Sequence, residues 1–227
     1  MVIDTPKHRS EASCPNCWKE TRFCLCAEVP VFSTRTRLLI LQHPREARNP
    51  LGTARLTSLA LPNAVHRVGL SWPSLSKAVG TQVDSQRWAV LFLGALKETK
   101  QFKEEVPFQI LGKGGKSVPF KQIEGVVLLD GNWKQSKTLW WRNPWLLRLH
   151  RVILNTASPS QYGTIRRQPR KHCLSTIEAA AESLAALGED PAVETGLKDL
   201  FSRFVNRVQE ADARGPARPT PEPDLEP

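Results

Sequence analysis

One stretch of the chain, GVVLLDGNWKQSKTLWW, joins an apolar run to a basic segment that is rich in tryptophan. Asp130 and Trp133 lie at the junction between the two. A carboxylate at the end of a buried strand can serve as a general base when a proton donor comes within hydrogen-bond reach. The same carboxylate can instead cap the helix that the following residues favour. The sequence therefore makes Asp130 the leading catalytic candidate and leaves a capping role open as the alternative.

Four of the five cysteines lie close together near the N-terminus, spaced as Cys-x2-Cys-x6-Cys-x-Cys. They are Cys14, Cys17, Cys24 and Cys26. Four thiolates form a closed tetrahedral zinc site, which favours a structural role because no position remains for water. The first residues lack the apolar segment of a secretory signal, which argues for a reducing compartment in which metal binding is favoured over disulfides. We expect structural zinc, with free or disulfide-linked cysteines as the alternative.

The chain carries a net charge of +10, and its cations are concentrated where acidic residues are absent. From Gly131 to Ile177 there is no Asp or Glu, and four of the seven tryptophans fall in the same stretch. Cations bind phosphates, and exposed aromatic faces can stack on unpaired bases. This composition predicts nucleic-acid binding. The alternative is that the tryptophans belong to the core and the cations only solvate a surface.

Apolar runs bounded by turn residues predict strands, and apolar residues at three- and four-residue spacings predict helices. The expected strands cover residues 37–42, 65–70, 87–93, 125–129 and 151–155. The expected helices cover residues 53–61, 134–142, 175–187 and 194–210, and a capping box of Ser175 and Glu178 opens the third. Strands that alternate with helices indicate an α/β fold with a mainly parallel sheet. Ligands bind at the carboxyl ends of the strands in such sheets, and Asp130 lies at one such end.

The composition divides the chain into three parts. Residues 1–32 form the zinc-binding cysteine module, residues 33–212 a large α/β domain, and residues 213–227 a disordered tail that is rich in proline. No apolar run is long enough to span a membrane, which together with the missing secretory signal predicts a cytoplasmic protein. There is also no Gly-x-Gly-x-x-Gly or Walker loop, and GKGGK at residues 112–116 is expected to be a surface loop.

Five short motifs follow one another along the chain: the four-cysteine module, LQHPRE with TARL soon after, LLDGNWKQSK, YGTIRR and LSTIEA. In their order and spacing they resemble the DTW-domain family, the tRNA-uridine aminocarboxypropyltransferases. The resemblance runs from Cys14 to Ala179 and makes residues 33–212 the DTW catalytic domain. The family is named after D-x-T-W. Here Asn132 occupies the third position, without the hydroxyl and the β-branch of threonine.

The resemblance implies an α/β fold with a SPOUT-like trefoil knot near its C-terminus, as in the knotted RNA methyltransferases. It also implies S-adenosylmethionine as the donor of a 3-amino-3-carboxypropyl group and tRNA as the acceptor. N3 of a uridine would attack the Cγ carbon next to the sulfonium, and methylthioadenosine would leave. Because N3 carries a proton, a base must remove it, and Asp130 is the candidate. No metal is needed for that step, which agrees with a closed zinc site.

The resemblance also suggests which residues contact the two substrates. The expected donor-binding residues are Leu93, Trp133, Leu154, Tyr162, Leu174 and Thr176. The expected RNA-binding residues are Lys134, Lys137, Arg166, Arg167 and Arg170. Arginine suits phosphates and carboxylates alike because its planar guanidinium binds both with paired hydrogen bonds. We expect tRNA as the partner, no membrane or DNA partner, and a monomer.

Several of these residues also have simpler structural interpretations. Trp133 could pack in the core, His43 could stabilise its own turn, and Glu46 could hold a neighbouring arginine. Glu178 is most simply the partner in the capping box. Two other functions remain open: an RNA methyltransferase that uses the same donor, and a zinc-ribbon RNA-binding protein without catalysis.

Overall fold

The computed structural model describes residues 13–91, 108–112, 115–154, 160–163, 165 and 174–213. Six strands form one sheet in the order β2-β1-β5-β3-β6-β4. In chain order the strands are β1 (Arg37–Gln42), β2 (Val65–Val68), β3 (Trp88–Leu91), β4 (Phe108–Leu111), β5 (Gly125–Asp130) and β6 (His150–Leu154). Every neighbouring pair is parallel except β4 and β6, which are antiparallel at one edge. This confirms the expected α/β fold with a mainly parallel sheet.

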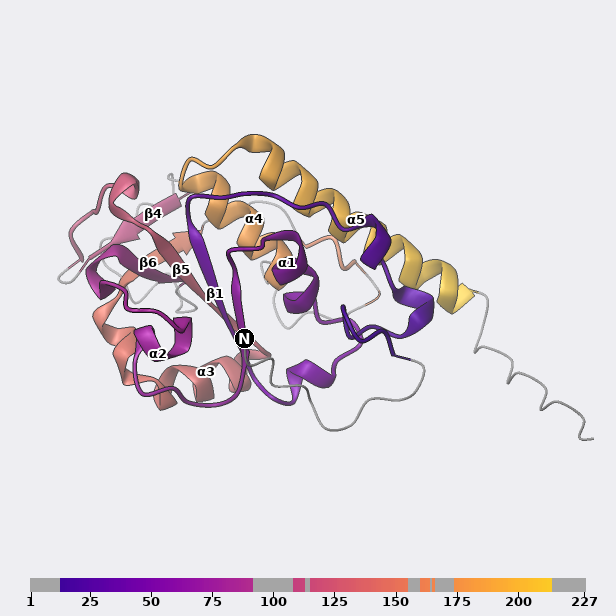
Figure 1. The fold of residues 1–227 in the computed structure, drawn as a ribbon, viewed down its shortest axis with the longest axis horizontal. Coiled ribbons are helices and arrows are strands. Elements are labelled where there is room, and N and C mark those ends of the chain that lie inside the picture. Colours follow the sequence, from indigo (N-terminus) through magenta and orange to yellow (C-terminus); the bar gives the residue numbers. More distant parts are fainter. Residues whose placement is uncertain are drawn as a thin grey trace, which may run out of the picture.

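Helices cover both faces of the sheet (Figure 1). They are α1 (Ala54–Ala60), α2 (Leu75–Val79), α3 (Trp133–Arg142), α4 (Thr176–Ala186) and α5 (Pro191–Ala213). One apolar cluster joins α1, α4 and α5 to one face of the sheet, and a second joins α2 and α3 to the other. Neighbouring residues of a strand enter different clusters, as Ile40 and Leu41 of β1 do. A strand between two helical layers must therefore be apolar almost throughout.

The central strand β5 carries Asp130 to a defined face of the sheet. All six residues of β5 are buried, and Val126 and Leu128 belong to the cluster under α1, α4 and α5. Because alternate strand residues share a face, Asp130 points to the same side. Gln42 of β1 lies opposite Asp130 in the parallel register. Leu38 and Ile40, the alternate residues before Gln42, belong to the same cluster, so Gln42 also points to that face. The sheet thus sets these two polar side chains next to each other.

Most expected elements are confirmed, with shifts at their ends. β2 ends at Val68 instead of residue 70, and α3 begins at Trp133 instead of residue 134. α5 begins at Pro191 because proline suits the first position of a helix and Asp190 accepts a hydrogen bond from the N–H of Ala192 at 2.8 Å. β4 and α2 were not expected, since each is too short to show a clear period.

Some expectations lie beyond the described part of the chain. They are the ends of two strands at residues 92–93 and 155, part of the 112–116 loop, and the tail from residue 214 onward. Within the described ranges, none of the helices is both long and apolar enough to cross a bilayer.

The cysteine module is packed onto the main core. Two 3-10 turns follow its first two cysteines, at Thr21–Phe23 and Cys26–Glu28. Phe23 lies in the same apolar cluster as Phe204 of α5. The guanidinium of Arg207, also on α5, donates to the carbonyl oxygen of Cys24 at 2.6 Å. The C-terminal half of the last helix therefore supports the module, and Figure 1 shows the dark N-terminal ribbon beside this part of α5.

Gly125 opens β5 against the buried indole of Trp88, and the closeness of that contact predicts a test of the packing. A Cβ at residue 125 would lie 2.5 Å from the Trp88 ring. Gly125→Ala should therefore lower the free energy of unfolding by about 1–3 kcal/mol, as measured by chemical denaturation. The same substitution should cost less in a Trp88→Leu background, because the clashing ring is gone. An equal cost in both backgrounds would contradict the clash.

Candidate functional site

Asp130 ends β5 with its side chain buried. Its Oδ2 accepts a hydrogen bond of 2.7 Å from Nε2 of Gln42, the last residue of β1. Its Oδ1 accepts a hydrogen bond from the hydroxyl of Thr176, the first residue of α4. Two strands and one helix therefore meet at a single carboxylate. This is the carboxyl edge of the parallel strands, where α/β proteins place their ligands.

A different residue caps the helix that follows. Asn132 is the N-cap of α3: its Oδ1 accepts from the N–H of Gln135 at 3.0 Å, and Oε1 of Gln135 accepts from the N–H of Asn132 at 2.7 Å. This reciprocal pair is a capping box. Gly131 lets the turn close, because a Cβ there would lie 2.8 Å from the Cβ of Gln135. The alternative in which Asp130 caps the helix is therefore wrong.

The turn after β1 supports the same junction. The N–H of His43 donates to the carbonyl oxygen of Asp130 at 3.0 Å, and Nδ1 of His43 accepts from the N–H of Arg45 at 3.1 Å. Burial, assisted by the charge of Arg45, lowers the pKa of His43 below its ordinary value. Glu46 is buried, and its Oε1 accepts from Nδ2 of Asn49 at 2.8 Å. The bonds of His43 support its structural interpretation. The bond to Glu46 comes from Asn49, whereas the sequence suggested a neighbouring arginine.

Glu178 fixes the N-terminus of α4. It forms the expected capping box with Ser175. Its carboxylate also accepts from the hydroxyl of Ser160 at 2.6 Å and from the N–H of Gln161 at 2.8 Å. The expected capping partner therefore has a second role, which is to tie the segment before α4 to the helix. Because Thr176 follows the cap directly, the same bonds fix the hydroxyl that reaches the buried carboxylate.

The structure brings three of the expected donor-binding residues to the edge at which β5 ends. Leu154 ends β6, Leu174 lies two residues before α4, and Thr176 opens that helix. Leu154, Leu174 and Thr176 are half-buried. Leu93 lies outside the described residues.

Tyr162, another expected donor-binding residue, is held in the core. Its ring packs edge-on against Phe201 of α5 with a centroid distance of 4.8 Å. Its hydroxyl donates to the carbonyl oxygen of Leu51 at 2.6 Å. The structure thus gives the ring a packing role and uses the hydroxyl to hold the loop that follows β1.

The indole of Trp133 lies at the surface, at the start of α3. It is 40% exposed, and Nζ of Lys137 lies 5.5 Å from the ring centroid. The alternative in which Trp133 packs in the core is therefore wrong, and Trp88 and Trp145 are the buried indoles instead. Which tryptophan is buried depends on the packing of α3 against the sheet, which the composition alone does not show.

α3 carries the described members of the expected RNA-binding set. Lys134 and Lys137 are exposed on this helix, and Trp141 on the same helix is 75% exposed. Exposed cations and indoles on one helix are the combination that phosphates and unpaired bases would contact. The other expected RNA-binding residues, Arg166, Arg167 and Arg170, lie outside the described residues.

Gln42, which binds Asp130, and His66, which binds Gln42, were not predicted from the sequence. Oε1 of Gln42 lies 3.0 Å from Nε2 of His66 on β2, so that the ring N–H donates to the amide oxygen. Burial, assisted by the charge of Arg55, lowers the pKa of His66 to about 3, which keeps the ring neutral at neutral pH. The available signal was Gln42 itself, a polar residue directly after the apolar run LLIL. Its partners follow from the strand order, which a single strand does not reveal.

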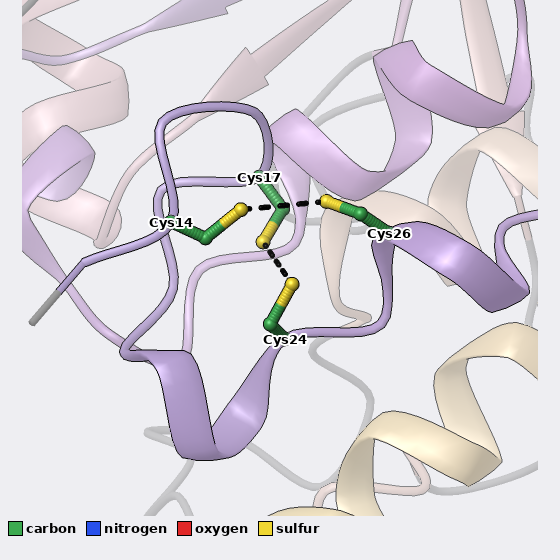
Figure 2. A group of neighbouring side chains, drawn as sticks. All are labelled: Cys14, Cys17, Cys24 and Cys26. Atoms are coloured by element: carbon green, nitrogen blue, oxygen red, sulfur yellow. Dashed lines mark hydrogen bonds between the residues drawn. The ribbon is translucent and has the colours of Figure 1, made fainter.

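The four thiols of the cysteine module converge on one point (Figure 2). All four Sγ atoms lie within 4.8 Å of one another, with 3.6 Å between Cys14 and Cys26 and 3.7 Å between Cys17 and Cys24. Sulfurs on a tetrahedral zinc ion, at a Zn–S distance of about 2.3 Å, lie about 3.8 Å apart. The cluster therefore has the residue types and the spacing that zinc requires.

The thiols of this cluster differ in their pKa. Burial acts to raise the pKa of Cys14, but the backbone N–H groups of Cys17 and Asn16 and the neighbouring thiols stabilise its thiolate and bring the pKa to about 6. Burial raises the pKa of Cys17, and burial together with the other thiols raises that of Cys26. A bound divalent cation would ionise such thiols and release their protons.

Comparison with known proteins decides the family. The sequence profile of the DTW domain matches residues 11–209. The chain belongs to the DTW-domain family. No solved structure shows a significant match to the chain.

Curated relatives are similar over most of this chain. A Drosophila melanogaster protein named tRNA-uridine aminocarboxypropyltransferase 2 is 30% identical over 87% of this chain and 74% of its own length. A Mus musculus protein of the same name is 28% identical over 88% of this chain and 64% of its own length. An Arabidopsis thaliana protein named tRNA-uridine aminocarboxypropyltransferase A is 27% identical over 84% of this chain and 78% of its own length. This chain thus spans less than two thirds of the mouse protein.

The departure from the D-x-T-W motif falls on the cap of α3. Threonine and asparagine are both favoured at an N-cap, because each offers a side-chain oxygen to the first free N–H groups of the helix. Asn132 makes that bond here, and Gln135 returns it. The DTW motif can therefore accept asparagine at this position without loss of the turn that follows Asp130.

This interpretation of Asn132 predicts the effect of two substitutions. Asn132→Ala should lower the free energy of unfolding by about 1 kcal/mol, because an N–H at the start of α3 loses its acceptor. Asn132→Thr should stay within about 0.5 kcal/mol of the natural chain, because the acceptor is restored. Chemical denaturation measures both. A threonine variant as unstable as the alanine variant would show that capping does not explain the residue at this position.

Proposed function

We propose that this protein transfers the 3-amino-3-carboxypropyl group of S-adenosylmethionine to N3 of a uridine in tRNA, with release of methylthioadenosine. Membership in the DTW family and the names of the curated relatives support the proposal. The observation that carries it is the buried carboxylate of Asp130, which Gln42 and Thr176 hold at the carboxyl edge of the parallel sheet. A base in this position suits a reaction whose nucleophile must first lose a proton.

In this proposal the donor supplies an electrophilic carbon next to its sulfonium sulfur. The protein supplies the base and the alignment of the two substrates. Asp130 takes the proton from N3, and the fixed carboxylate holds the nucleotide in line with the carbon under attack. Alignment of this kind contributes much of the rate of a bimolecular reaction, because bound reactants no longer lose translational and rotational freedom at the barrier.

We place the donor along the edge at which β5 and β6 end. Its proposed contacts are Leu93, Trp133, Leu154, Tyr162, Leu174 and Thr176. The half-buried Leu154 and Leu174 offer apolar surface for the adenosine and methionine parts. The hydroxyl of Thr176 reaches the base itself, so the same residue would join the donor side of the site to Asp130. We also propose the SPOUT-like knot in this part of the chain, on the strength of the family alone.

We place tRNA on the exposed side of α3. Its proposed contacts are Lys134, Lys137, Arg166, Arg167 and Arg170. The net charge of +10 favours a polyanion, and the exposed indoles of Trp133 and Trp141 offer stacking surfaces. Because α3 starts three residues after Asp130, RNA on this helix would lie next to the base.

The other parts of the proposal concern organisation. Zinc would be held by the four thiols of Cys14, Cys17, Cys24 and Cys26, where it would hold the knuckle closed and supply no catalytic water. Residues 1–32 would then form the zinc module, residues 33–212 the catalytic domain and residues 213–227 a disordered tail. We propose a cytoplasmic monomer without a DNA or membrane partner.

The function is tested with unmodified tRNA and labelled S-adenosylmethionine, followed by nucleoside mass spectrometry. The expected products are uridine with an added 3-amino-3-carboxypropyl group and an equal amount of methylthioadenosine. A methylated nucleoside with S-adenosylhomocysteine would replace the proposal by an RNA methyltransferase. Saturable tRNA binding without donor binding or product would leave an RNA-binding protein without catalysis.

Replacement of the proposed base gives a prediction in the same assay. Asp130→Asn should lower kcat by at least about 100-fold, because the amide cannot take the N3 proton. The Kd of the donor should change little, since the amide keeps the size of the side chain and an acceptor for Thr176. The thermal unfolding midpoint should fall, because the new NH2 group faces Nε2 of Gln42, and turnover is therefore compared well below it. Asp199→Asn on the exposed side of α5 is the matched control and should leave kcat unchanged. Near-normal turnover in Asp130→Asn would remove Asp130 from the mechanism.

Metal analysis tests the cysteine module. The purified protein should contain one zinc ion per chain, and chelation should lower its thermal unfolding midpoint, because binding energy at such a site is folding energy. Cys17→Ser should lose the ion, since Cys17 is a buried member of the cluster. Cys173→Ser is the matched control and should keep it. Full zinc content in Cys17→Ser, or none in the natural chain, would contradict the zinc site.

A further inference from the structure

A row of two hydrogen bonds crosses three neighbouring strands and ends at the proposed base; the bond to Asp130 is buried and the bond from His66 is partly buried. Nε2 of His66 on β2 donates to Oε1 of Gln42 on β1, at 3.0 Å. Nε2 of Gln42 donates to Oδ2 of Asp130 on β5, at 2.7 Å. The order β2-β1-β5 places these side chains side by side, and the register pairs Ile40 with His66 and Gln42 with Asp130. None of these bonds is explained by helix capping or by a turn.

The direction of each bond in the row is determined. A carboxylate can only accept, so Gln42 must turn its NH2 group to Asp130. The amide oxygen then faces His66, and Nε2 of the ring must carry the proton. The ring of His66 is itself placed by Trp18, whose ring centroid lies 5.4 Å away. The orientation of the Gln42 amide is therefore set at both of its ends.

Two donors from different elements hold the two oxygens of the carboxylate. Thr176 of α4 binds Oδ1, and Gln42 of β1 binds Oδ2. The last torsion of an aspartate side chain has a broad energy profile, so one donor alone would leave the plane of the carboxylate free to turn. With both donors present, its oxygens are fixed relative to the edge at which substrates would bind.

We infer that Gln42 is a positioning residue for the transfer reaction: its amide, oriented by His66, fixes the carboxylate plane of Asp130. The inference rests on the proposed function in one respect, since it takes Asp130 to be the base. A purely structural Gln42, which only joins β1 to β5, would stabilise the fold and leave turnover in the folded protein unchanged. The two cases differ in kcat, in donor affinity and in the response to conservative substitutions.

Substitution of Gln42 separates these cases. Gln42→Met keeps the length of the side chain but has no hydrogen to donate to Asp130, and Gln42→Leu also shortens it. Each variant should lower kcat by about 10- to 100-fold, because displacement of a catalytic group by about 1 Å costs up to about 100-fold. The Kd of S-adenosylmethionine and the KM of tRNA should stay within twofold. Gln122→Met on an exposed 3-10 turn is the matched control and should leave kcat unchanged.

A second pair of variants tests the role of His66. His66→Gln offers an amide N–H near the position of Nε2 and should therefore keep most of the turnover of the natural chain. His66→Leu removes that donor and should lower kcat several-fold, because the Gln42 amide can then rotate. All assays are run well below the unfolding midpoint of each variant, which is measured in parallel. If His66→Gln is as slow as His66→Leu, the donor at this position is not what orients Gln42.

The outcomes distinguish this inference from the proposed function. Wild-type kcat in Gln42→Met would overturn the inference, and so would an unchanged kcat with weaker donor binding, which would make Gln42 a ligand contact. A methylated product would contradict the proposed function and leave the kcat comparison valid. If the natural chain shows no transfer, NMR of the His66 ring decides: the inference requires a slowly exchanging Nε2 proton that Gln42→Leu exposes to fast exchange. A fast-exchanging proton in the natural chain would overturn it.

Discussion

The pairing of β1 with β5 is the interaction on which the site depends. It runs from Arg37 opposite Gly125 to Gln42 opposite Asp130, and its last pair is polar. Side chains paired in this register point to the same face, so the amide and the carboxylate meet without any loop to bring them together. A slip of one residue would turn Asp130 towards the other face, under α2 and α3. Close packing resists that slip, because alternate residues of both strands are packed into two different apolar clusters.

The start of α4 completes what the strands begin. Ser175 and Glu178 close the cap, and Glu178 also holds Ser160 and the N–H of Gln161. Four donors at one buried carboxylate compensate for its loss of hydration, as a buried charge requires. The helix directs its N-terminus towards Asp130 through Thr176, whose hydroxyl donates to the carboxylate. The same cap therefore orders a loop and positions a donor to the proposed base.

The sequence predicted what depends on local patterning, and missed what depends on pairing between distant segments. Strands flanked by turn residues and the Ser175 capping box could be recognised within a few residues of their true ends. Both Asp130 and Asn132 are good capping residues, so only the hydrogen bonds to Gln135 decide between them. Gln42 looked like the end of a strand, and its bonds to two other strands follow from the sheet order. The four cysteines could be identified from their spacing, because all four metal-ligand candidates lie within thirteen residues of the chain.

The cysteine module also helps to support the site. Nζ of Lys19 donates to the carbonyl oxygens of Pro50 and Gly52 in the loop after β1. Trp18 has a φ of 63°, a left-handed conformation that costs about 1 kcal/mol or more outside glycine. Its ring lies against His66, with the guanidinium of Arg55 5.1 Å from the ring centroid. Such a strained residue persists only where its surroundings hold it. The contact between Trp18 and His66 both holds Trp18 and places His66, whose ring donates to Gln42 and so leads to Asp130.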